Sequence, residues 1–207
     1  MLLYLSSQKF GNKINLLKNW IKEHDNKILL VFNAMDAKDA EKVENNIKED
    51  RKLLEEIGFE VTILDLKEYF DNNEKLKEKF MKYNACCIMG GNVFVLREAM
   101  KYRGLDKLLQ EKIASEDFLY IGYSAGSCVT GKDLKIFEQV DEPKKYYNKD
   151  NIFAEGLDFI DYIFIPHYKS DYHKVHLIEK IVEKCQRENK KYKSVRDGEV
   201  IIENIRG

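Results

Sequence analysis

The segment Gly122-Tyr123-Ser124-Ala125-Gly126 has the residue types of a nucleophile on a sharp strand-to-helix turn. It follows the apolar run 118–122 and precedes a segment compatible with a helix. Small residues two positions before and after a serine let the backbone fold tightly and expose the hydroxyl. We therefore predict Ser124 as a nucleophile for acyl transfer, with the Ala125 N–H directed toward a developing oxyanion. The alternative is a plain turn in which Ser124 is only an N-cap.

A serine hydroxyl needs a base near neutral pH, and His167 is placed to act as one. It follows the apolar run 163–166, so we expect it at the carboxyl edge of a buried strand. Open α/β sheets gather their active groups at that edge. The other histidines, His24, His173 and His176, fall in helical patterns, where we expect solvated side chains.

A third chemical signal is Met89-Gly90-Gly91-Asn92, which also follows an apolar strand-like run and precedes a helical pattern. Two glycines allow a backbone N–H to approach a substrate closely, so Gly91 is a candidate for the second oxyanion donor beside Ala125. We expect Asn92 to contact substrate. The other interpretation of these residues is an ordinary turn between a strand and a helix.

Short apolar runs alternate with longer amphipathic stretches, which predicts an α/β fold with a mostly parallel sheet. The predicted strands are residues 2–5, 28–32, 59–64, 85–89, 118–122 and 162–165. The predicted helices are residues 13–24, 38–57, 93–113 and 172–187. Residues 192–205, with Asp197-Gly198 in the middle, look like a β-hairpin. Residues 132–151 show no clear pattern, and loops of that length are often functional.

Composition predicts one soluble domain covering residues 1–207. Hydrophobic residues make up 44% of the chain, charged residues 34%, and the net charge is -1. That balance argues against a nucleic acid or an anionic membrane as partner and favours a small substrate. We expect no signal peptide and no transmembrane segment, because no apolar run approaches the roughly 20 residues needed. The four cysteines show no metal-ligand spacing, so we expect reduced thiols in a cytoplasmic protein.

Taken together, these motifs resemble the peptidase E and cyanophycinase group of serine peptidases, peptidase family S51. The matching pieces are Asn33-Ala34, GGNVFVLREAM from Gly90, YIGYSAGSCVTG from Tyr120 and IPHY from Ile165. The resemblance implies a three-layer α/β sandwich of the class I glutamine amidotransferase-like (flavodoxin-like) type. It also implies hydrolysis of a small, dipeptide-like peptide through an acyl-enzyme, by a monomer or homodimer that uses no metal or organic cofactor. Ser124 would be the nucleophile and His167 the base, with Gly91 and Ala125 as oxyanion donors.

The chain departs from the peptidase E pattern in two places. The segment that carries the acid in that family reads LKIFEQVDEP here, so Glu138, Asp141 and Glu142 are all candidates to orient His167, and cyanophycinase-like spacing favours Glu142. The arginine-bearing segment that grips an acidic side chain is missing after His167, although Lys169 could supply a charge for substrate binding.

The missing acid motif keeps a second function open, a non-catalytic binding or regulatory protein on the same fold. A glutamine amidotransferase is a third possibility, but its chemistry uses cysteine where this chain has Ser124. Cys128 would lie one helical turn further on, too deep to replace it.

Overall fold

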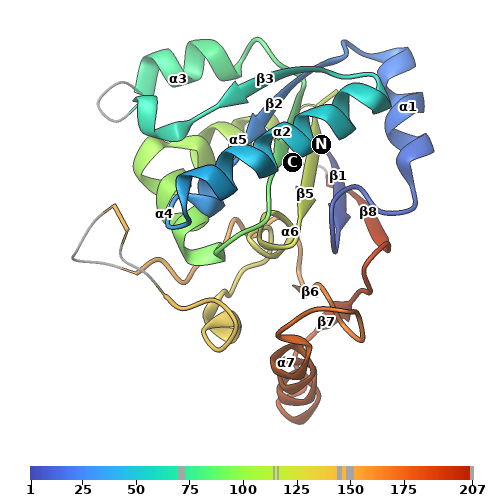
Figure 1. The fold of residues 1–207 in the computed structure, drawn as a ribbon, viewed down its shortest axis with the longest axis vertical. Coiled ribbons are helices and arrows are strands. Elements are labelled where there is room, and N and C mark those ends of the chain that lie inside the picture. Colours follow the sequence, from blue (N-terminus) through green and yellow to red (C-terminus); the bar gives the residue numbers. More distant parts are fainter. Residues whose placement is uncertain (70–72, 114, 116, 144–145, 148–151, 206–207) are drawn as a thin grey trace.

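A six-stranded, mostly parallel sheet forms the centre of the protein (Figure 1). The computed structural model describes residues 1–69, 73–113, 115, 117–143, 146–147 and 152–205. The strand order is β3-β2-β4-β5-β1-β8, and only β8 runs antiparallel to its neighbour, β1. The strands are β1 Leu2–Ser6, β2 Lys27–Val31, β3 Glu60–Leu64, β4 Ala85–Ile88, β5 Leu119–Tyr123 and β8 Val200–Asn204. The predicted α/β class is confirmed.

Helices cover both faces of this sheet. The α-helices are α1 Ile14–Glu23, α2 Ala40–Ile57, α3 Asn73–Phe80, α4 Val93–Arg103, α5 Leu105–Ile113, α6 Ala125–Cys128 and α7 Val175–Arg187. The described part of the chain also contains the short 3-10 helices η1 Asn33–Met35, η2 Leu66–Tyr69 and η3 Lys135–Phe137. The predicted helix over 93–113 is two helices, because Gly104 adopts a left-handed conformation with φ 74° and ends α4. No helix in the described ranges combines the length and apolar character needed to cross a bilayer.

The period-2 alternation of the strands divides their side chains between two cores. In β2, Ile28 and Leu30 belong to the core shared with α1 and α2, whereas Leu29 and Val31 belong to the core shared with α3, α4 and α5. All four are fully buried. Burial on both sides explains why the inner strands are continuous apolar runs in the sequence.

The C-terminal part forms a second, two-stranded sheet, where the structure corrects the predicted hairpin. β6 (Ile163–Ile165) pairs in parallel with β7 (Tyr192–Ser194), while β8 pairs with β1 in the main sheet. The turn at Asp197-Gly198 therefore connects two sheets instead of two paired strands. β6, β7 and α7 lie together at one end of the molecule (Figure 1). This arrangement carries residues 195–199 toward the carboxyl end of β1.

Candidate active site

Three side chains from distant parts of the chain form a hydrogen-bonded series. His167 Nε2 lies 3.0 Å from Ser124 Oγ, and His167 Nδ1 lies 2.7 Å from Asp197 Oδ1. Ser124 is half-buried, His167 is 7% exposed, and the Asp197 side chain is 21% exposed. A hydroxyl, an imidazole and a carboxylate in this order have the geometry of a nucleophile, its base and the group that orients the base.

Ser124 stands at the turn between β5 and α6, as the sequence predicts. Its backbone has φ 50° and ψ -116°, a strained conformation for a residue with a Cβ, and strain of this kind is typical of nucleophile turns. A Cβ on Gly122 would lie 2.4 Å from the carbonyl oxygen of Gly126, so the turn requires a glycine there. Ala125 is the first residue of α6, and its N–H therefore has no partner within the helix.

The carboxylate at hydrogen-bond distance from His167 is that of Asp197, and not that of Glu142 as the sequence suggested. Glu138 is exposed, and Asp141 Oδ2 accepts a hydrogen bond from Val93 N at 2.8 Å. The backbone carbonyl of Glu142 accepts a bond from Asn92 Nδ2 at 2.9 Å. The 138–142 segment therefore packs against the start of α4, and Asp141 lines the cleft without taking the place of Asp197 at His167 Nδ1. Only a tertiary signal, the docking of β8 on β1, could have identified Asp197.

Asn92 is the N-cap of α4, and its contact with substrate stays a prediction. Its Oδ1 accepts hydrogen bonds from Phe94 N at 2.9 Å and Val95 N at 3.1 Å, and its amide is bonded to Glu142. The side chain therefore fixes the N-terminus of α4. This cap holds the preceding glycine turn in place beside Ser124.

Gly91 has a backbone that only glycine adopts easily. Its φ is 153°, and a Cβ there would lie 2.3 Å from the carbonyl oxygen of Ala34. The turn is thus pressed against η1, and both Gly90 and Gly91 line the cleft that contains Ser124. The role of the Gly91 and Ala125 amides as oxyanion donors stays a prediction at this point.

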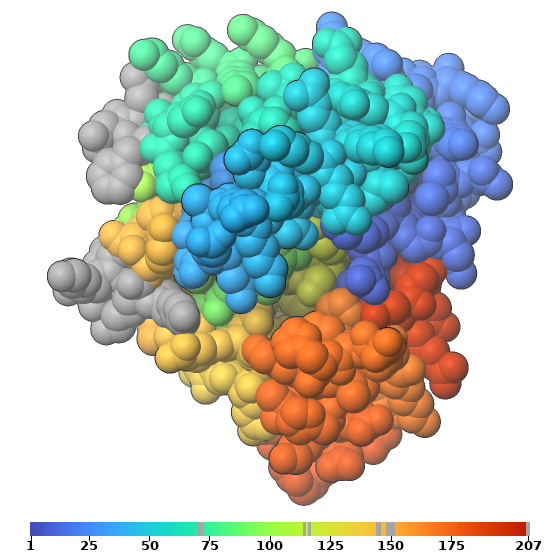
Figure 2. All heavy atoms as spheres, viewed as in Figure 1, coloured from blue at the N-terminus to red at the C-terminus, as the bar shows by residue number. Residues whose placement is uncertain are grey.

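The cleft around Ser124 and His167 has a volume of about 260 Å³. On the face shown in Figure 2, the light-blue start of α2 and the orange segment that includes α7 border the same part of the surface. Lys9, Lys38 and Lys174 line the cleft. Lys169 is exposed, and its Nζ lies 5.2 Å from the Tyr168 ring centroid, outside the cleft lining. The cations near the nucleophile are thus different from the one that the sequence suggested.

The Tyr123 ring forms one wall of the cleft, and its hydroxyl is hydrogen-bonded to a buried carboxylate. The Tyr123 hydroxyl donates to Asp50, whose side chain is fully buried and pairs with Lys9 Nζ at 2.5 Å. A Cβ on Gly90 would lie 2.8 Å from this ring. The ring therefore fills the space between the serine turn and the glycine turn.

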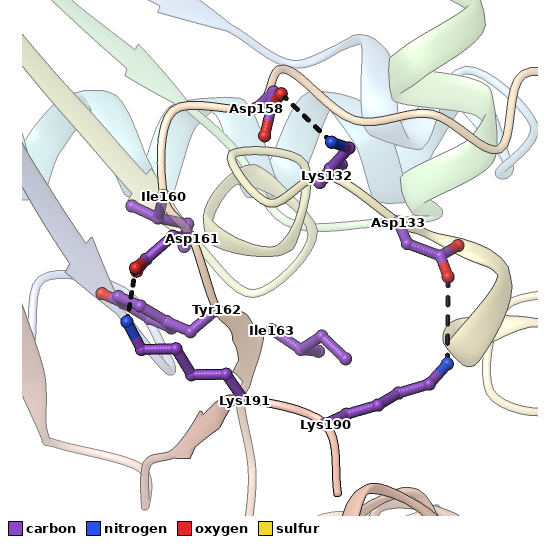
Figure 3. Close-up of a pocket in the computed structure, with 9 residues that line it drawn as sticks. All are labelled: Lys132, Asp133, Asp158, Ile160, Asp161, Tyr162, Ile163, Lys190 and Lys191. Carbon is purple, nitrogen blue, oxygen red and sulfur yellow. Dashed lines mark hydrogen bonds and ion pairs between the residues drawn. The ribbon is translucent and has the colours of Figure 1, made fainter. Parts of the chain in front are cut away.

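A second surface pocket, of about 370 Å³, lies beside β6 and contains no part of the series (Figure 3). Its lysines and aspartates pair with one another, as in Lys191 with Asp161 and Lys190 with Asp133. The described residues that line it include no serine, cysteine or histidine. We therefore assign the chemistry to the cleft at Ser124.

Burial keeps His167 in the state that a base requires. Desolvation lowers the pKa of His167 below its ordinary value of 6.5, although the nearby Asp197 carboxylate opposes this shift. The imidazole also stacks on Tyr172, with ring centroids 4.2 Å apart. A neutral imidazole can accept the serine proton, whereas the protonated form cannot.

We therefore expect activity to persist below pH 6.5 and to fall only as the pH drops through the lowered pKa of His167. The measurement is the reaction rate at a subsaturating concentration of substrate or probe, from about pH 4 to about pH 9, so that both limbs of the pH profile are covered. The protein must be shown by circular dichroism to stay folded throughout. An acidic limb centred above the ordinary histidine value would contradict this expectation.

Comparison with known proteins identifies the family. The chain matches the sequence model of peptidase family S51 over residues 2–204. It is 32% identical over 134 residues to the uncharacterized peptidase Lmo0363 of Listeria monocytogenes, a match that spans 65% of this chain and 63% of that protein. It is 25% identical over 109 residues to the uncharacterized peptidase PM1590 of Pasteurella multocida, spanning 53% of this chain and 51% of that one.

Two solved structures share the fold. A crystal structure of a candidate peptidase E protein from Listeria monocytogenes superposes with a TM-score of 0.77 at 24% identity, covering 99% of this chain and 98% of that one. A peptidase from an acI-B1 Actinobacterium gives a TM-score of 0.71 at 15% identity, covering 98% of this chain and 83% of that one. The family match extends over nearly the whole sequence, and the chain belongs to peptidase family S51, a family of serine-type peptidases.

Proposed function

We propose that this peptidase hydrolyses short peptides through an acyl-enzyme, with Ser124 as nucleophile, His167 as general base and Asp197 as the acid that orients the base. The observation that carries the proposal is the unbroken pair of hydrogen bonds, 3.0 Å from Ser124 Oγ to His167 Nε2 and 2.7 Å from His167 Nδ1 to Asp197 Oδ1. The missing acid motif favoured a non-catalytic protein, and in this proposal Asp197 takes the part of that acid.

In the proposed reaction, His167 Nε2 takes the Ser124 proton as Oγ bonds to the substrate carbonyl carbon. The carbonyl oxygen becomes an oxyanion, for which the N–H groups of Gly91 and Ala125 are the proposed donors. The C–N bond then breaks, and His167 returns the proton to the leaving amine. Water repeats the sequence on the acyl-enzyme and releases the acid. This chemistry requires no metal and no organic cofactor.

The proposed substrate is a small peptide with a free carboxylate near the scissile bond. The cleft, at about 260 Å³, is small, and Lys38 and Lys174 bring positive charge to it beside Asp141, whereas Lys9 is paired with Asp50. A panel of dipeptides with varied N-terminal residues, including Asp-X, together with isoaspartyl and cyanophycin-type peptides, separates the possibilities. A cytoplasmic location and a monomeric or homodimeric state stay predictions, and the four free, buried cysteines support the first of them.

A fluorophosphonate probe tests the proposed nucleophile without knowledge of the natural substrate. Ser124 Oγ would form a bond to phosphorus, fluoride would leave, and His167 would accept the hydroxyl proton. We expect one label per chain, located on Ser124 by peptide mass mapping, and loss of labelling in His167→Ala. Labelling of another residue, or no labelling of the folded protein, would favour the non-catalytic binding protein.

A further inference from the structure

Ser7 directly follows the carboxyl end of β1, the strand that pairs with β5. Its side chain is fully buried, and it contacts both His167 and Asp197. We propose that Ser7 is a positioning residue that fixes the His167–Asp197 pair relative to Ser124. This inference rests on the proposed function, since it concerns the same three residues.

The hydrogen bonds of Ser7 have a fixed direction. His167 N lies 2.7 Å from Ser7 Oγ, and a backbone N–H can only donate. The single hydroxyl proton of Ser7 is therefore free for Asp197 Oδ1, also at 2.7 Å. This is the carboxylate oxygen that His167 Nδ1 contacts. One hydroxyl thus holds the backbone of the base and the oxygen that orients its ring.

The backbone of His167 needs such support, because its φ is 61°, in the left-handed region. A non-glycine residue keeps that conformation only where its surroundings hold it. The bond from His167 N to Ser7 is on one side, and a bond of 3.3 Å from Ser170 N to His167 O is on the other. The Ser170 hydroxyl in turn accepts a bond from Asp197 N at 2.7 Å. Ser7, at the end of a strand of the main sheet, thus contacts both His167 and Asp197 and links this network of hydrogen bonds to the sheet.

Ser7 also changes the electrostatics of the pair. A hydroxyl that donates to the Asp197 carboxylate spreads its negative charge, so that Asp197 stabilises a protonated His167 less than it would alone. Removing the hydroxyl should therefore raise the pKa of His167. The ionisable groups that face His167 or line the cleft with it, in the part of the chain that the structure describes, are Asp197, Tyr172, His173, Tyr123, Lys9, Lys38, Asp141 and Lys174. None of these groups is removed by Ser7→Ala, so a shift reports on the loss of the hydroxyl.

The test is the second-order rate constant of fluorophosphonate labelling, measured against pH for the wild-type chain and Ser7→Ala. We expect the plateau rate to fall about 10- to 100-fold, the size expected for one lost hydrogen bond to a charged group. We also expect the acidic limb to move to higher pH. Thr130→Val is the matched control, because Thr130 is fully buried and its hydroxyl donates to Ser127 O at 2.6 Å, away from the three residues. Thr130→Val should keep the wild-type plateau rate of labelling and the wild-type position of the acidic limb.

Ser7→Cys provides a second variant if the alanine protein folds poorly, since a thiol keeps a similar shape but is a weak donor. It should show the same direction of shift. A rate within about twofold of the wild type, or a slower rate with an unmoved acidic limb, would mean that Ser7 is only structural. Absence of labelling in the wild-type chain would instead refute the proposed function, so the two failures are distinguishable.

Discussion

Replacing Ser124 with alanine is expected to lower peptide hydrolysis by about 10⁴-fold or more, with the fold intact. Ser124 Oγ is the atom that lies 3.0 Å from His167 Nε2, and alanine removes it while keeping the Cβ of the strained turn. The measurement is kcat on the best peptide of the panel, with thermal unfolding as the check on the fold. We expect the unfolding midpoint to change by only a few degrees, about the shift that 1 kcal/mol produces in a chain of this size.

Ser127→Ala is the matched control for this loss. Ser127 is fully buried, and its hydroxyl bonds the carbonyl oxygens of Ser6 at 2.9 Å and Gly122 at 2.8 Å. Its removal should cost about 1 kcal/mol of unfolding free energy and leave hydrolysis largely unchanged. Hydrolysis by Ser124→Ala at the wild-type rate would rule out the nucleophile assignment.

Replacing Asp197 with asparagine should lower kcat by about 10⁴-fold, the cost known for the same change in a serine triad of another fold. Asparagine keeps the size of the side chain, but its amide can donate a proton to Nδ1 and so favour the wrong imidazole tautomer. Ser7 and the Nδ1 atom of His167 both contact Asp197 Oδ1, so this one oxygen organises the base.

Glu142→Gln is the comparison that separates the structure from the sequence-based prediction. We expect its kcat to stay within a few-fold of the wild type, because the contact of Glu142 with the α4 cap is made by its backbone carbonyl. The pair of kcat values decides between the two acids. A large loss in Glu142→Gln together with near-normal activity in Asp197→Asn would restore the earlier assignment.

Local patterns were enough to predict the fold class and to single out Ser124 and His167, two of the three residues in the hydrogen-bonded series. The serine turn and the end of β6 are each defined within a few residues, by glycines that the backbone requires and by an apolar run that ends at His167. The boundaries of the strands in the main sheet agree within one or two residues, since continuous apolar runs mark strands buried on both faces.

The acid could not be predicted, because its position depends on tertiary pairing. Asp197-Gly198 has the composition of a tight hairpin turn, and the strands on either side of it belong to different sheets. Asp197 reaches His167 across 30 residues of sequence only after β7 pairs with β6 and β8 pairs with β1. Similarly, the chemistry of Lys169 suggested a substrate contact; the structure places this exposed residue outside the lining of the cleft at Ser124, so the contact stays a prediction.

The dependence of Asp197 on β8 opens a route to allosteric inhibition. β8 is the last strand of the main sheet and is bonded there to β1, and no strand of the described residues pairs with its outer edge. A binder that peeled β8 away from β1 would withdraw the carboxylate from the imidazole. Such a molecule would silence the peptidase without entering the cleft or competing with substrate.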